Sequence, residues 1–171
     1  MPLATHNILI KDANMNRRNF IGFGVLAMAT LPATLSAFSS IDFRKTKPDT
    51  WTAKTVDDAI KALYGDIKPE EGGVKVKGPK VASNGGAVPV TIKSDIQAKT
   101  VALFQNMNPE SAVAVFNVPE DGLVDYFLKI KLKATEENGG NGVVTAILEG
   151  TDGKFYKGEF KLNVAKGGCE G

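Results

Sequence analysis

The chain has very few of the side chains on which most enzymes rely. Among its 171 residues there is one histidine, His6, and one cysteine, Cys169. A single cysteine excludes an internal disulfide and a thiolate zinc cage. His6 lies in a segment that we expect to be removed, which leaves no Ser-His pair, no Cys-His pair and no imidazole metal ligand. The sequence therefore predicts a protein that is not an enzyme and that holds neither a metal ion nor a cofactor.

A concentrated positive charge, which nucleic-acid binding requires, is also lacking. The formal net charge is +2, and all of it comes from the first 37 residues, which hold Lys11, Arg17 and Arg18 against Asp12. The remaining chain is neutral overall and has a single arginine, Arg44. No nucleic-acid partner is expected.

Residues 1–37 have the pattern of an export signal. Arg17 and Arg18 directly precede an apolar stretch from residue 20 to residue 37 that ends in small residues. A basic region, a moderate apolar region and a small-residue cleavage point define such a signal, and paired arginines are typical of the twin-arginine type. The alternative is a membrane anchor, but the stretch is at the short limit for a span. We expect a periplasmic protein with no membrane attachment after signal removal.

Met15 stands directly before Asn16 and the paired arginines, and it offers a second start of translation. A start there would make residues 1–14 an upstream artefact. Either start gives the same exported protein, which begins at about residue 38 because cleavage follows the small residues.

Residues 38–73 are expected to form an extended lead-in and one short helix. No hydrophobic period is visible in residues 38–50. Thr55 is a favourable helix N-cap, and Gly65 is a favourable residue just beyond a helix C-terminus. The apolar residues between them share one helical face, which indicates a packing stripe.

Residues 74–164 are expected to form an antiparallel β-sandwich of the immunoglobulin type, so that the fold class is all-β. Seven short segments rich in β-branched and aromatic residues alternate with turn clusters of Gly, Asn, Asp and Pro. The segments are 74–81, 88–93, 100–106, 112–117, 123–133, 143–149 and 154–164. Asp152 and Gly153 predict a hairpin between the last two segments. Residues 165–171 would then be a flexible arm beyond the sandwich.

Two segments of the sandwich could be mistaken for ligand sites. Lys129, Lys131 and Lys133 alternate with apolar residues, and we interpret them as a solvated face or an edge guard, with Phe127 among the inward-facing residues. The glycine-rich loop 138–142 precedes a strand and not a helix, so it does not have the context of a phosphate site. We interpret this loop as a mobile connection.

The C-terminal arm carries the only cysteine. Free cysteine is usually buried, but Cys169 stands two residues from the end of the sequence, and we expect its thiol to lie outside any core. Gly167 and Gly168 supply a hinge, and the arm from Val164 to Cys169 reaches about 15–18 Å. This pattern predicts a thiol that is presented to another molecule. The alternative is an incidental cysteine at a ragged terminus.

A twin-arginine signal, a predicted sandwich and a terminal Gly-Gly-Cys together resemble the SoxY family of the periplasmic thiosulfate-oxidising (Sox) system. The specific parts are residues 78–90, GPKVASNGGAVPV, and residues 167–169. The resemblance implies an immunoglobulin-like sandwich that forms a heterodimer with a SoxZ-like subunit. It implies Cys169 as the covalent attachment site of sulfur intermediates, with Gly167 and Gly168 as its hinge. It also implies SoxAX-, SoxB- and SoxCD-like enzymes as partners.

Glu170 departs from the Gly-Gly-Cys-Gly-Gly tail that is usual in the family. A carboxylate beside the thiol disfavours the thiolate and anionic adducts, and it removes the freedom of one glycine from the arm. Because the site is exposed and screened, we expect only a modest effect on reactivity.

A covalent carrier is thus the leading hypothesis, with two alternatives. One is an exported immunoglobulin-like interaction module whose cysteine is incidental or forms an intermolecular disulfide. The other is a thiol enzyme such as a peroxidase, which would need a preformed pocket that a glycine arm does not supply. An ordinary thiol has a pKa of ~8.5 and is only a few per cent thiolate at neutral pH. Activation of Cys169 is therefore expected from the active site of a partner.

Overall fold

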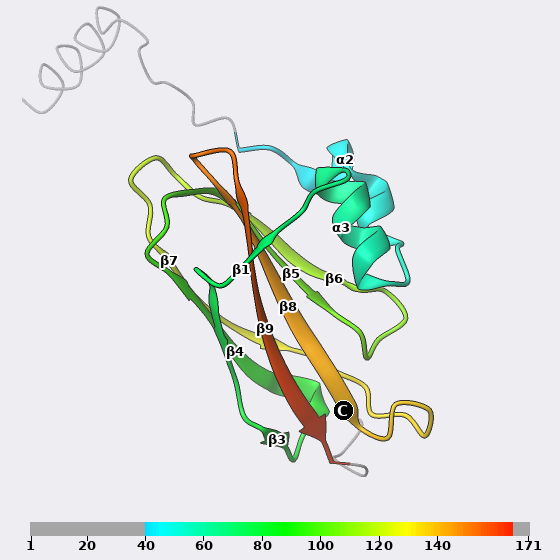
Figure 1. Ribbon diagram of the computed structural model, residues 1–171. Coiled ribbons are helices and arrows are strands. Elements are labelled where there is room, and N and C mark those ends of the chain that lie inside the picture. Colours follow the sequence, from blue (N-terminus) through cyan, green and yellow to red (C-terminus); the bar gives the residue numbers. More distant parts are fainter. Residues whose placement is uncertain (1–39, 166–171) are drawn as a thin grey trace, which may run out of the picture. The chain divides into compact units, whose positions relative to one another are not determined.

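The computed structural model describes residues 40–165, and these form two β-sheets that pack face to face (Figure 1). The larger sheet has the strand order β1-β9-β8-β5-β6, with β3 paired to the end of β9. The smaller sheet has the order β2-β4-β7. The predicted export signal and the predicted arm lie outside the described residues, apart from Ala165. The expected all-β sandwich is confirmed.

The bounds of the elements follow the chain. The strands are β1 (Glu70–Glu71), β2 (Lys75–Lys77), β3 (Val81–Ala82), β4 (Val88–Ser94), β5 (Ala98–Gln105), β6 (Ala112–Asn117), β7 (Val124–Ile130), β8 (Asn141–Gly150) and β9 (Phe155–Val164). The helices are α2 (Phe43–Thr46), the 3-10 turn η1 (Pro48–Trp51), α3 (Val56–Tyr64) and the 3-10 turn η2 (Gly85–Ala87).

The main core lies between the two sheets. Successive side chains of a strand point to opposite faces, and Val88, Val90 and Ile92 of β4 are fully buried while the residues between them are exposed or half-buried. Leu103 of β5 and Leu148 of β8 close this core from the larger sheet. Burial of such apolar surface is the main driving force for folding.

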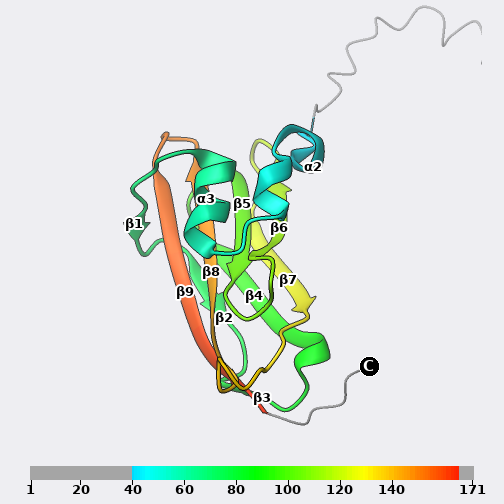
Figure 2. The same ribbon diagram turned by 90° about the vertical axis from the view of Figure 1, so that its right-hand side faces the viewer.

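The helix α3 covers part of the outer face of the larger sheet (Figure 2). The Thr55 hydroxyl accepts a hydrogen bond from the Asp58 N–H at 3.1 Å and caps the helix, and Gly65 follows its last residue with φ 81°. Ala59 and Leu63 are buried and pack with Phe104 of β5. The predicted helix and both of its end signals are confirmed.

The hairpin predicted at Asp152 and Gly153 joins β8 to β9. Gly153 has φ 80°, a left-handed conformation that glycine adopts without strain. The Gly150 N–H donates to the Lys154 carbonyl at 2.8 Å, and β8 and β9 pair antiparallel along their whole length.

Three details of the expected fold are corrected. The lead-in of residues 38–50 is not extended where it is described, because it contains α2 and most of η1. The expected strand 74–81 is split into β2 and β3, which belong to different sheets. The sandwich is also not wholly antiparallel, since β1 and β3 both pair with β9 in parallel.

Phe127 is also placed differently from the expectation. It alternates with Tyr126 and Leu128 on β7, and its side chain is 65% exposed on the outer face of the smaller sheet. Because neighbouring residues of a strand point to opposite faces, Phe127 and Leu128 could not both face the core. Phe127 therefore shares the solvent face with Lys129.

Candidate functional site

Cys169, Gly167 and Gly168, which the sequence singles out, lie outside the described residues. The structure describes the point from which their segment departs. β9 ends at Val164, which is 3% exposed, and Ala165 is the last described residue. The chain therefore leaves the sandwich from a buried position.

Segment β3 holds one side of this departure point (Figures 1 and 2). The Asn163 N–H donates to the Lys80 carbonyl, and the Ala165 N–H donates to the Ala82 carbonyl, both at 2.9 Å. Ala82 and Val164 are parallel partners in the register. Backbone bonding thus continues to the last described residue.

A glycine holds the other side. The Val164 N–H donates to the Gly140 carbonyl at 2.7 Å. Gly140 has φ 81°, and a Cβ atom on it would overlap the carbonyl oxygen of Val164. We call Val164 and Ala165, with their partners Lys80, Ala82 and Gly140, the arm base.

The loop 138–142, expected to be a mobile connection, forms several hydrogen bonds with neighbouring segments. The Asn138 side-chain oxygen accepts hydrogen bonds from the N–H of Thr135 at 2.9 Å and of Gly140 at 2.8 Å. The Asn138 amide donates to the Lys133 carbonyl at 3.0 Å. These bonds and the contact with Val164 attach the loop to the end of β9, and its mobility stays a prediction.

Gly85 packs beneath the arm base. Its carbonyl accepts a hydrogen bond from the Leu132 N–H at 2.8 Å. A Cβ atom on Gly85 would overlap the Leu132 carbonyl oxygen and lie 2.9 Å from Cγ1 of Val164. Residues 78–90, which carry the resemblance within the sandwich, therefore fold directly against the end of β9.

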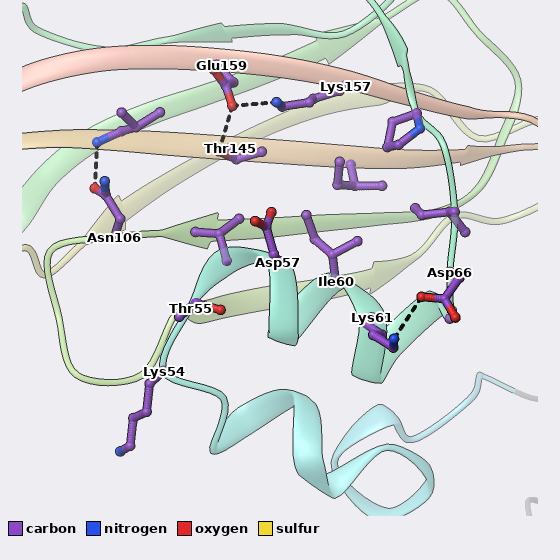
Figure 3. Close-up of a pocket in the computed structure, with 16 residues that line it drawn as sticks. Lys54, Thr55, Asp57, Ile60, Lys61, Asp66, Asn106, Thr145, Lys157 and Glu159 are labelled. Carbon is purple, nitrogen blue, oxygen red and sulfur yellow. Dashed lines mark hydrogen bonds and ion pairs between the residues drawn. The ribbon is translucent and has the colours of Figure 1, made fainter.

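A separate groove of about 760 Å³ lies between α3 and the strands β8 and β9 (Figure 3). On its sheet side, Lys157 forms an ion pair with Glu159 at 2.8 Å, and the Thr145 hydroxyl donates to the same carboxylate at 3.4 Å. The hydrogen bond to Glu159 raises the pKa of the Lys157 amine. The lining residues include no thiol and no imidazole, so the groove offers ion-paired polar surface and no nucleophile of the kind that Cys169 would supply.

Among residues 40–165, no three His, Cys, Asp or Glu side chains are grouped closely enough to bind a metal ion. Nor does any helix there have the length and apolar character needed to cross a membrane.

The sequence matches the model of one protein family over most of the described residues. The family model described as "Sulfur oxidation protein SoxY" matches residues 60–169, well over half of the chain. The chain belongs to the SoxY family. The match begins within α3, includes the arm base and ends at Cys169. The resemblance drawn from the sequence is therefore confirmed.

Solved structures include a further SoxY protein. The sulfur carrier protein SoxY from Chlorobium limicola f thiosulfatophilum is 25% identical, with a TM-score of 0.55 over 71% of this chain and 95% of that chain. A superoxide reductase (neelaredoxin) from Ignicoccus hospitalis is 14% identical, with a TM-score of 0.41 over 54% of this chain and 80% of that one. No curated protein matches the chain.

The sequence indicated the SoxY family but not the arm base. Lys80 and Ala82 act through their carbonyl groups, which every residue has, so their side chains gave no signal. The clusters Gly85-Gly86 and Gly139-Gly140 were the available signal, because a glycine can mark a close approach of two backbones. That signal does not say which backbone approaches.

Proposed function

We propose that this SoxY-family protein is a covalent sulfur carrier in thiosulfate oxidation, with the thiol of Cys169 as the attachment site. The observation that carries the proposal is the family match, which extends to Cys169 itself. The similar structure from Chlorobium limicola is described as that of a sulfur carrier protein. Gly167 and Gly168 would serve as the hinge of the arm.

The arm base supports this role physically. Hydrogen bonds on both sides of β9 hold Val164 and Ala165, so the arm begins from a defined point of the sandwich. From Val164 the thiol of Cys169 can reach about 15–18 Å. A carrier needs this combination, because its cargo must enter an active site while its own domain stays outside.

The chemistry of loading would belong to the partner enzymes. Formation of a bond between the thiol of Cys169 and the outer sulfur of thiosulfate removes two electrons and the thiol proton. We propose that a SoxAX-like haem enzyme accepts these electrons, that a SoxB-like enzyme then releases sulfate by hydrolysis, and that a SoxCD-like enzyme oxidises the remaining sulfur. No imidazole lies among residues 40–165 to activate the thiol, since the single histidine is His6.

Assembly and location complete the proposal. We propose that the protein forms a heterodimer with a SoxZ-like subunit and reaches the periplasm by the twin-arginine route. An unpaired cysteine is unusual in such an oxidising compartment, and a cysteine that carries cargo gives a reason for one. Glu170 beside the thiol would lower the stability of anionic adducts modestly.

The test is intact-mass spectrometry of the exported protein without reductant, followed by peptide mapping. We expect a reducible sulfur adduct on the C-terminal peptide, because the thiol would be loaded in the cell. A Cys169→Ser variant should lose all loading while keeping its fold and its association with the SoxZ-like subunit. An unmodified thiol that thiosulfate and the cognate loading enzyme leave unchanged would instead support an exported interaction module.

A further inference from the structure

The outer face of the smaller sheet has an exposed aromatic residue midway along its edge strand β7. In the register, Lys77 of β2, Thr91 of β4 and Phe127 of β7 lie side by side across the sheet. Phe127 is 65% exposed. The helices α2 and α3 pack in the cluster on the other sheet, so neither of them covers this face.

Lysines lie toward both ends of the sheet from Phe127, whose neighbours on the exposed face of β7 are Asp125 and Lys129. Lys75, Lys77 and Lys93 line a depression of about 200 Å³ toward one end, together with Asp95. Toward the other end, Lys129 follows Phe127 on the exposed face of β7. Lys131 and Lys133 continue the exposed positions beyond the strand, on either side of the buried Leu132. We call these lysines and Phe127 the lysine face.

These lysines differ from most others in the described part of the chain. Elsewhere in residues 40–165, Lys45, Lys54, Lys61, Lys99, Lys154 and Lys157 each lie within ion-pair distance of a carboxylate. On the lysine face only Lys93 has such a partner there, Asp125 at 2.8 Å. Asp95 lies in the same depression and Asp125 pairs with Lys93, so the lysines outnumber the carboxylates of this face and leave it with a net positive charge.

We propose that the lysine face docks an acidic protein surface with an apolar indentation, on the enzyme that loads cargo onto the arm. The identity of this partner rests on the proposed function. Unpaired lysines raise the rate of encounter with an acidic surface. Phe127 supplies the apolar anchor of the contact, because aromatic residues are enriched in protein interfaces.

The position of the lysine face favours an enzyme that receives the arm. Leu132, between Lys131 and Lys133, is hydrogen-bonded to Gly85, which packs against Val164 of the arm base. A protein docked along the row of lysines would therefore lie beside the origin of the arm. Glu136 and Glu137 follow at once in the sequence and are exposed, so they would repel an acidic surface that moved further along and would fix its position.

The experiment measures loading of the carrier, in complex with its SoxZ-like subunit, by the cognate loading enzyme with thiosulfate. The test variants are Lys129→Glu/Lys131→Glu and Phe127→Ser. The matched control is Lys47→Glu/Lys68→Glu, which makes the same charge change at two exposed lysines that do not belong to the lysine face. Cargo on Cys169 is followed by mass spectrometry at low and at physiological salt.

We expect the charge-reversed variant to raise the KM for the carrier about tenfold at low salt, with kcat unchanged, because the arm and its thiol are intact. Added salt should reduce the difference, since it screens exposed charges. Phe127→Ser should raise KM at both salt concentrations. The control should stay within about twofold of the wild type.

Three results would overturn the proposal. The first is an equal KM for all variants, and the second is loss of the SoxZ-like subunit from the charge-reversed variant. The third is that the variants keep wild-type kinetics but no longer bind vesicles of phosphatidylglycerol and phosphatidylethanolamine. The last would assign the face to a lipid surface. If the wild type takes up no cargo, the proposed function fails, and the lysine face is then tested by measuring the affinity of the loading enzyme for the wild type and for each variant.

A salt-sensitive affinity that the variants lose would support the docking proposal. Equal affinities for the wild type and the variants would overturn it.

Discussion

Single glycines decide how closely the backbones approach at the arm base. Gly139 and Gly140 are neighbours with positive φ angles of 58° and 81°. They differ in their surroundings, because a Cβ atom on Gly139 would meet its nearest atom, in the side chain of Asn141, at 3.6 Å, whereas on Gly140 it would overlap the Val164 backbone. Substitution of each glycine in turn therefore distinguishes the free-energy cost of a left-handed backbone from the cost of steric overlap with Val164.

We predict that Gly139→Ala lowers the free energy of unfolding by about 1–2 kcal/mol, the cost of a left-handed alanine. Gly140→Ala should lower it by about 1–3 kcal/mol more, because overpacking against backbone is added. Denaturant unfolding measures both values. Hydrogen exchange should show faster exchange of the Val164 amide in Gly140→Ala alone, and equal exchange in both variants would contradict our account of the arm base.

At the scale of the element, α3 is held by its cap and by its last residue. Thr55 caps the N-terminus, and Tyr64 at the C-terminal end bonds to Thr100 of β5, with 2.9 Å between their hydroxyl oxygens. The Tyr64 ring also contacts Phe155 of β9, with 5.1 Å between the ring centroids. The helix therefore depends on tertiary contacts, as short helices do.

Thr55→Ala is expected to lower the free energy of unfolding by about 1 kcal/mol, because the Asp58 N–H loses its acceptor. Thr55→Ser keeps a hydroxyl at the same position and serves as the control, with an expected loss of less than about 0.5 kcal/mol. Denaturant unfolding measures both variants. Equal losses would show that the methyl group of Thr55, and not the cap, stabilises the helix.

The pH dependence of stability should expose the burial of Tyr64. Burial raises the pKa of its hydroxyl well above the ordinary range, since the phenolate would be desolvated. An acid whose pKa is higher in the folded state stabilises the fold fully below its unfolded pKa, which is about 10. That contribution is lost as the pH rises above this value. The protein should therefore lose stability above about pH 10.

We predict that Tyr64→Phe reduces this alkaline loss, although it costs about 1 kcal/mol at neutral pH through the missing hydrogen bond. Unfolding in denaturant between neutral and alkaline pH measures the change. Tyr156→Phe is the comparison, because Tyr156 is only half-buried and its pKa is raised chiefly by its hydrogen bond to Asp152. If both variants have the same alkaline profile, burial of Tyr64 is not the cause.

At the scale of the whole molecule, the two sheets are joined by one apolar core. Leu103 of β5 is fully buried in this core, whereas Leu123, before β7, is 81% exposed. These residues have the same side chain and opposite surroundings. A comparison of substitutions at the two positions therefore measures how much the stability of the sandwich depends on packing between its sheets.

Leu103→Ala should lower the free energy of unfolding by about 2–5 kcal/mol, because the side chain leaves a cavity between the sheets. Leu123→Ala should change it by less than about 0.5 kcal/mol, as at other exposed sites. Thermal and denaturant unfolding measure both variants. A large loss in Leu123→Ala would indicate that this residue packs against something outside residues 40–165.

The sequence alone determined the fold class, α3 and the bounds of β6, because each depends on local signals. The period of apolar residues selects helix or strand, and caps and turn residues mark the ends. Family membership was also accessible, since residues 78–90 and 167–169 are contiguous motifs. The role of Cys169 and the export signal stay predictions.

Only the tertiary structure decided the rest. The helix α2 and the turn η1 have weak local signals and depend on tertiary contacts, such as the hydrogen bond that the Asn117 amide donates to the Ile41 carbonyl, next to α2, at 3.0 Å. Gly140 and Val164 meet across the fold, so no local pattern pairs them. The lysine face combines residues from β2, β4 and β7 of a chain with almost no net charge. The overall composition does not reveal a local excess of positive charge. Which lysines become neighbours depends on how the strands pair, and this register is a property of the tertiary structure.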